Sequence, residues 1–170
     1  GNGCYWNISF SESSPVACTG DIRTLIDYDN YSSVSTSEAR FCSLFEDCAV
    51  LTSAPQLLAK TLAGSCYSSM FSGCSSLTEA PKLIAPVLVN ECYSEMFCDC
   101  TSLEEVYLGA TSGFELIGIE GDPLDYWLGD TETAGTVYCT QELLDAAQGS
   151  AAIARDVANT FGWSLEKWTE

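Results

Sequence analysis

The stretch CYSSMFSGCSSLTEAPKLIAPVLVNE, residues 66–91, is followed directly by CYSEMFCDCTSLEEVYL, residues 92–108. A third copy, RFCSLFEDCAVLTSAPQLLAKTLAGS, precedes both at residues 40–65. The matching columns are mostly apolar or sulfur-containing: Phe41, Tyr67 and Tyr93; Leu44, Met70 and Met96; Phe45, Phe71 and Phe97; Cys48, Cys74 and Cys100; and Leu51, Leu77 and Leu103. Agreement in so many columns at one fixed period indicates an internal repeat of 26 residues.

Each copy carries two patterns in the same order. Tyr67, Met70, Phe71 and Cys74 stand at i, i+3, i+4 and i+7, which predicts one face of a short helix. Residues 77–83 then predict a short extended piece, because proline biases the residue before it toward extended geometry. The sequence therefore predicts an α/β fold, a short right-handed leucine-rich-repeat-like solenoid of three repeats, each a short helix plus a short strand.

The segments on either side of the repeats are expected to cover the exposed ends of the stack. We expect one compact unit divided into an N-terminal cap at residues 1–39, the repeats at 40–108 and a C-terminal cap at 109–170. Within the last cap the pattern predicts a strand over 135–139, a helix over 141–148 that Thr140 caps, and a second helix from Ser150 to Thr160.

The second copy is similar to the repeat of BspA-like leucine-rich proteins, a family of surface and secreted proteins of gut and oral anaerobic bacteria. The matching residues are Cys66, Tyr67, Met70, Phe71, Gly73, Cys74, Ser76, Leu77, Ala80, Pro81 and Leu83. The third copy departs from the pattern, with Asp99 in place of the glycine and Glu105-Val106 in place of Ala-Pro. The resemblance implies a non-enzymatic cell-surface or secreted module for recognition or adhesion, which binds a protein or glycan partner through the repeat surface.

Localisation is expected to be extracellular or at the cell surface. The chain begins with Gly1 and shows no leader, which we interpret as a processed form, and a lipid anchor upstream of residue 1 fits the same interpretation. An alternative function stays open, that of a structural component of a surface or phage assembly.

The charge balance excludes several partners. The chain has 24 acidic and 6 basic residues, a net charge of −18, which repels the phosphate backbone of nucleic acids. No apolar run approaches the roughly 20 residues needed to cross a bilayer, so we expect no membrane insertion. Calcium binding stays open for the densest acidic segment, which comprises Glu115, Glu120, Asp122, Asp125, Asp130 and Glu132.

Enzymatic activity and cofactors are not expected. The chain has no histidine, which removes the commonest general base and metal ligand. It also lacks a phosphate-binding glycine loop and a GxSxG motif.

The candidate binding residues are the polar residues that lie between the repeated apolar ones on the extended part of each repeat. They are Thr52, Gln56, Thr78, Glu79, Lys82 and Glu104. The simpler alternative, that these side chains are only solvated, stays open. Trp163 and Trp168 are expected to be packing residues, with a platform for stacking sugars as the alternative.

The ten cysteines fall into two groups. Those repeated in register are expected to be buried thiols rather than disulfides: Cys48, Cys74, Cys100, Cys66 and Cys92. Outside the register, Cys4 and Cys18 are the candidates for a disulfide in the N-terminal cap. Zinc at Cys98 and Cys100 is a remote alternative, because the chain has no CxxC pair.

Overall fold

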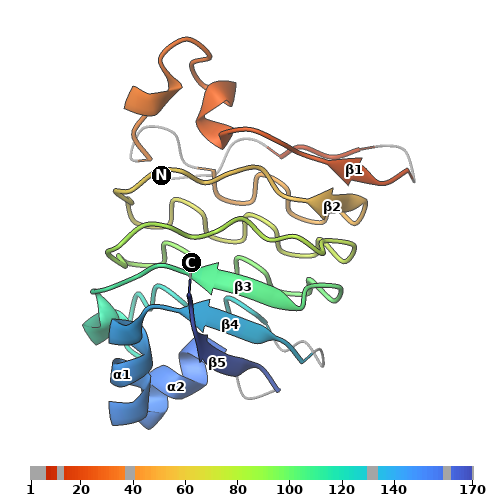
Figure 1. Ribbon diagram of the computed structural model, residues 1–170. Coiled ribbons are helices and arrows are strands. Elements are labelled where there is room, and N and C mark those ends of the chain that lie inside the picture. The colour runs from red at the N-terminus through yellow and green to blue at the C-terminus, as the bar shows by residue number, and fades with distance from the viewer. Residues whose placement is uncertain (1–6, 11–13, 37–40, 130–133, 159–161, 170) are drawn as a thin grey trace.

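The fold is a small α/β domain with two parallel sheets. The computed structural model describes residues 7–10, 14–36, 41–129, 134–158 and 162–169 (Figure 1). The first sheet pairs β1 (Val16–Ala17) with β2 (Leu51–Ser53), and the second has the order β3-β4-β5. Its strands are β3 (Glu105–Leu108), β4 (Thr136–Cys139) and β5 (Ser164–Lys167). Two α-helices, α1 (Gln141–Gly149) and α2 (Ala151–Ala158), and three 3₁₀ helices, Ile22–Leu25, Tyr31–Ser33 and Phe114–Leu116, complete the described part.

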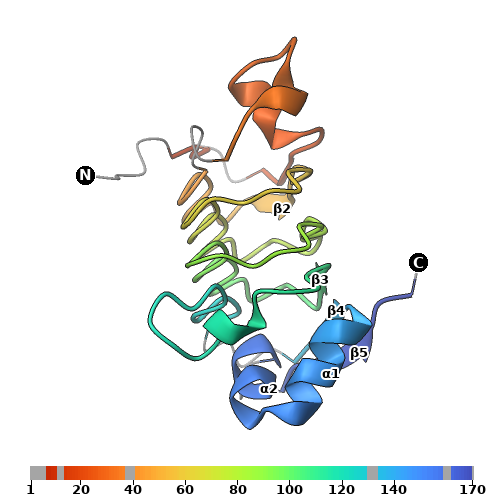
Figure 2. The same ribbon diagram turned by 90° about the vertical axis from the view of Figure 1, so that its left-hand side faces the viewer.

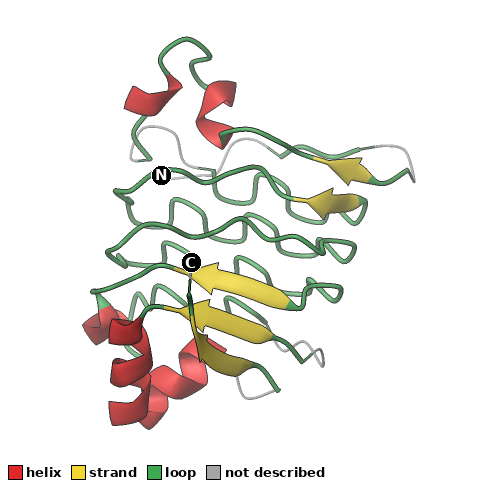
Figure 3. Ribbon diagram, in the orientation of Figure 1, coloured by secondary structure: helices red, strands yellow, loops and turns green. Residues whose placement is uncertain are grey.

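The predicted leucine-rich-repeat-like solenoid, with a helix and a strand in each of three units, is wrong. Both α-helices of the described chain lie after residue 140, and the copy at 66–91 contributes only isolated β-bridges to neighbouring strands. Figure 3 shows helices at the two ends of the molecule, while the part between them consists of loops and short strands.

The helix predicted from the i, i+3, i+4 pattern is replaced by a series of turns. Ser69 and Gly73 have φ of 53° and 75°, in the left-handed region that a right-handed helix excludes. The backbone N–H of Tyr67 donates to Cys92 O at 3.1 Å and that of Phe71 donates to Met96 O at 3.0 Å. These bonds run to the neighbouring copy rather than to the residue four positions earlier, so the segment is held laterally.

The turn-rich segments 41–48, 67–74 and 93–100 lie side by side as three layers (Figure 2). Their rings stack across the layers, with centroids 5.6 Å apart for Phe45 and Phe71 and 5.8 Å apart for Phe71 and Phe97. All three phenylalanines are buried. The predicted packing of repeated side chains into one shared interior is therefore confirmed, although the backbone that carries them is not the predicted one.

The repeated cysteines line the same interior. All five are buried, and Cys48, Cys74, Cys92 and Cys100 carry free thiols, as predicted. The Sγ of Cys74 donates to Phe45 O and the Sγ of Cys100 donates to Phe71 O, each at 3.1 Å. Each of these two thiols therefore satisfies a carbonyl of the preceding layer.

The disulfide predicted between Cys4 and Cys18 is not formed. Cys18 is a free, half-buried thiol, and Cys4 lies outside the described residues. Cys42 is disulfide-bonded instead. The sequence assigned no partner to Cys42, because pairing depends on how the chain brings cysteines together in space.

The C-terminal elements agree with their prediction. Strand β4 falls within the predicted 135–139, and Thr140 caps α1 by accepting a hydrogen bond from the N–H of Leu143 at 3.3 Å. Helix α2 follows Ser150, whose hydroxyl accepts from the N–H of Ile153 at 3.4 Å.

The indole of Trp127 closes the aromatic stack, with its centroid 6.3 Å from that of Phe97.

Candidate binding surface

Parallel pairing aligns one set of outward side chains along the extended side of the molecule. The parallel bridge of Ser53 with Glu79 places Gln56 beside Lys82 in the same register, and the bridge of Leu83 with Leu108 places Lys82 beside Tyr107. The register of the second sheet continues the line from Tyr107 to Tyr138 and then to Glu166. We call Gln56, Lys82, Tyr107, Tyr138 and Glu166 the outer column. Its members up to Tyr138 alternate with buried neighbours such as Val106 and Val137, as expected for a sheet with one face on the core.

Aromatic rings gather in the middle of the outer column. The rings of Tyr107 and Tyr138 stack with centroids 4.9 Å apart and planes inclined by 19°. The indole of Trp168 meets Tyr107 edge-on, at 5.5 Å and 64°. The Nζ of Lys82 lies 5.2 Å from the Tyr107 centroid and 5.4 Å from that of Trp168, within cation–π range of both. The four side chains form one contiguous, partly exposed cluster.

Two backbone features position the indole. The N–H of Trp168 donates to Cys139 O at 2.7 Å, which extends the β5 register by one residue. A Cβ at Gly109 would lie 3.4 Å from the indole and 3.1 Å from the carbonyl oxygen of Leu83. Only the approach to Leu83 is tight for an added carbon, whereas the approach to the indole is ordinary van der Waals contact, so the glycine allows the two backbones to pass closely beside Trp168.

The phenol of Tyr107 is held by a carboxylate. Its hydroxyl donates to Oε2 of Glu105 at 3.2 Å. Desolvation raises the pKa of Tyr107, and the hydrogen bond to Glu105 raises it further. The hydroxyl therefore stays protonated at neutral pH and remains a hydrogen-bond donor.

A shallow groove adjoins the cluster and contains three of the six predicted binding residues. Its volume is about 290 Å³, and Gln56, Glu79 and Lys82 line it together with apolar side chains that include Leu58 and Ile84. Glu79 accepts a hydrogen bond from the hydroxyl of Ser53 at 3.1 Å. Lys82 belongs to both the groove and the aromatic cluster, so the two form one continuous surface.

The other three predicted residues lie outside this groove. Thr52 is half-buried and its hydroxyl donates to Val16 O at 3.1 Å, while the exposed Thr78 donates in the same way to Thr52 O at 3.2 Å. These hydroxyls join neighbouring layers. Glu104 is exposed, and its carbonyl oxygen accepts from the N–H of Thr136 at 2.8 Å.

Sequence reasoning missed Tyr107 and Tyr138, and it gave Trp168 a binding role only as the alternative to packing. The third copy lacks one residue between Leu103 and Val106 compared with the second copy. The pairing shows this, since Leu83 lies beside Leu108, which is 25 and not 26 positions later. A strict 26-residue alignment therefore hides that Tyr107 is the neighbour of Lys82. Trp168 was expected to be a packing residue, and it packs on Tyr107 while remaining partly exposed.

A second, larger cleft lies among acidic residues at the C-terminal end. Its volume is about 580 Å³, and its lining includes Glu91, Glu120, Asp122, Asp125 and Asp156. Burial raises the pKa of Asp122, against the opposing effect of the N–H groups of Leu124 and Gly118 that donate to its carboxylate. Among the described residues no group of three or more histidine, cysteine or carboxylate side chains is arranged to hold a metal ion.

Part of the predicted calcium segment, Asp130 and Glu132, lies outside the described residues. No helix within the described ranges has both the length and the apolar character needed to cross a bilayer.

No family model, curated protein or solved structure matches this chain. The similarity to BspA-like repeats thus stays a prediction.

Proposed function

We propose that this chain is a non-enzymatic recognition module that holds a protein or glycan partner against the outer column and its adjoining groove. The observation that supports this best is the cluster of Lys82, Tyr107, Tyr138 and Trp168, which is partly exposed and lies outside the buried core. Tyrosine and tryptophan bury much area at little entropic cost and dominate the energetics of binding surfaces.

The cluster is also restrained before a partner arrives. Lys82 is held over two rings, and Tyr107 is fixed by Tyr138 on one side and by Glu105 through its hydroxyl. Side chains that are already ordered lose less entropy on binding, so a restrained cluster binds more tightly than a mobile one.

We place the module outside the cell or on its surface. The disulfide at Cys42 supports this location, because disulfides persist in oxidising compartments. The net charge of −18 disfavours polyanionic ligands, so the partner is expected to be neutral or basic.

Binding of the purified chain to an array of oligosaccharides and extracellular proteins tests the proposal. We expect a binding signal that falls at least tenfold in Tyr107→Ala and Trp168→Ala, as for residues at the centre of an interface. Tyr126→Ala is the matched control, because Tyr126 is 62% exposed and lies in the acidic cleft. Near-UV circular dichroism verifies folding of each variant. Equal binding by all three variants and the wild type would defeat the assignment of this surface.

A further inference from the structure

We propose a second interaction surface, separate from the outer column, at the loop formed by residues 22–33. This loop presents Leu25, Ile26 and Tyr28 to an apolar surface bordered by lysine or arginine on a partner protein. The inference goes beyond the proposed function, because it concerns a different face and a different kind of contact.

The loop concentrates exposed apolar area. Tyr28 is 80% exposed, Leu25 58%, Ile26 57% and Tyr31 39%. Single exposed apolar residues are ordinary in folded proteins, whereas four within seven consecutive positions form a patch of the kind that marks interaction sites. Figure 2 shows the loop projecting from the end of the molecule, away from the layers.

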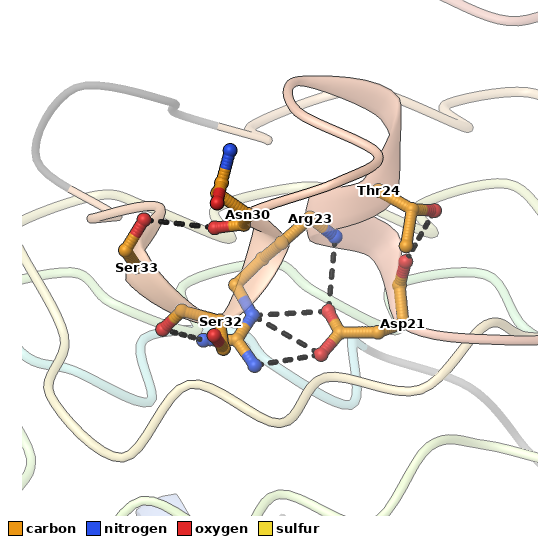
Figure 4. Close-up of polar contacts among 6 residues, drawn as sticks. All are labelled: Asp21, Arg23, Thr24, Asn30, Ser32 and Ser33. Carbon is orange, nitrogen blue, oxygen red and sulfur yellow. Dashed lines mark hydrogen bonds and ion pairs between the residues drawn. The ribbon is translucent and has the colours of Figure 1, made fainter.

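A buried ion pair holds the base of the loop (Figure 4). The guanidinium of Arg23 donates to both carboxylate oxygens of Asp21, with the shortest distance 2.6 Å, and both side chains are almost fully buried. Nη1 of Arg23 also donates to Ser32 O at 3.3 Å, which joins the two ends of the loop. Burial raises the pKa of Asp21, but the hydrogen bonds and charge of Arg23 outweigh it and lower the pKa overall.

The tip of the loop, residues 25–31, is held by hydrogen bonds within the loop. The carboxylate of Asp27 accepts from the N–H of Asp29 at 3.1 Å and from the N–H of Asn30 at 2.9 Å. The hydroxyl of Ser33 donates to Asn30 O at 2.8 Å. The apolar side chains are therefore displayed on a backbone that is ordered without a partner, which reduces the entropy lost on binding.

The negative charge around the tip favours a basic partner. Asp27 and Asp29 flank Tyr28, and residues 25–31 contain no lysine or arginine. The nearest cation along the chain, Arg23, is already paired with Asp21. Like charge at the tip and a net charge of −18 disfavour a second copy of this chain and an anionic membrane. An apolar protein surface bordered by lysine or arginine complements both features of the tip.

The test uses the full chain and two fluorescent 18-residue helical peptides, one of leucine and lysine and one of leucine and glutamine. The tip variant is Ile26→Ser/Tyr28→Ser. The matched control is Ile119→Ser/Tyr126→Ser, which removes the same residue types at 57% and 62% exposure from the acidic cleft. Neither double variant alters the net charge, so non-specific attraction of the lysine peptide is the same in both.

Fluorescence anisotropy is expected to show the wild type binding the leucine–lysine peptide more tightly than the leucine–glutamine peptide. The tip variant should lose at least tenfold in affinity for the leucine–lysine peptide, while the control stays within twofold of the wild type. Asp29→Asn should weaken binding by about twofold through loss of one rim charge. Circular dichroism and thermal unfolding confirm that each variant is folded.

Three results would overturn the inference. The first is an equal loss in the tip variant and the control, or no loss in either. The second is tip-dependent binding of the wild type to phosphatidylcholine vesicles, which would assign the tip to a membrane. The third is tip-dependent self-association in sedimentation velocity, which would assign it to a second copy. Binding of array partners through the outer column is measured separately, so either proposal can fail alone.

Discussion

The interior of this protein and its outer column are built on the same layers and follow opposite rules. Inside, Phe45, Phe71 and Phe97 stack as one repeated residue type. Outside, the residue changes from Gln56 to Lys82 to Tyr107, and it repeats only at the step from Tyr107 to Tyr138. A buried ring packs against the equivalent ring of the next layer, so close packing favours the same residue type in each copy. The outer side chains have no such constraint, and their variety makes a surface that a partner can distinguish.

The largest expected effect is on the interior. Phe71 packs between two rings, so Phe71→Ala removes contacts on both faces of the stack and should cost about 3–5 kcal/mol of unfolding free energy. Urea denaturation followed by circular dichroism measures it, with Tyr126→Ala as the surface control. A loss below about 1 kcal/mol would mean that the repeated rings do not form the interior.

Alkaline pH should act on the interior through its buried thiols. Burial raises the pKa of Cys74 and of Cys92 to about 12 from 9.0, so folding favours their neutral form. Their contribution to stability is complete below the unfolded-state pKa and declines as pH rises from there toward the folded-state pKa.

We therefore expect the unfolding free energy to fall between pH 9 and 11, and Cys74→Ala to reduce that slope. Urea denaturation at a series of pH values provides the measurement. A slope unaffected by Cys74→Ala would show that this thiol is not buried as the structure has it.

The smallest expected effect on stability concerns the outer column. Lys82→Met keeps the length of the side chain and removes its charge from over Tyr107 and Trp168, which should cost about 0.5–1 kcal/mol. Lys60→Met, at another exposed lysine, is the matched control and should leave stability unchanged. Thermal unfolding measures both variants. Equal midpoints for Lys82→Met and Lys60→Met would show that Lys82 does not lie over the rings.

The contrast between the two columns also explains what the sequence could predict. The interior was predictable because its buried positions recur in all three copies of the repeat, as at Phe45, Phe71 and Phe97. The helix was predicted wrongly because a left-handed residue at every fourth position, as at Ser69 and Gly73, produces the same apolar spacing. Periodicity of side chains does not reveal whether the backbone bonds within a segment or across to the next one.

The outer column was only partly predictable. Gln56 and Lys82 follow the repeat and were candidates from the sequence, whereas Tyr138 comes from a segment outside it. Tyr138 joins the column because β4 pairs in parallel with β3, and Trp168 reaches Tyr107 because β5 pairs in turn with β4. No local pattern encodes this tertiary packing.

The stacking of residues one repeat apart is tested most directly by nuclear Overhauser effects between phenylalanine rings in a selectively labelled sample. The structure predicts cross-peaks from Phe45 to Phe71 and from Phe71 to Phe97, whose centroids are 5.6 and 5.8 Å apart. It predicts no cross-peak between Phe45 and Phe97, which are separated by the middle ring. Absence of both neighbouring cross-peaks in the folded protein would contradict the shared interior on which both surfaces are built.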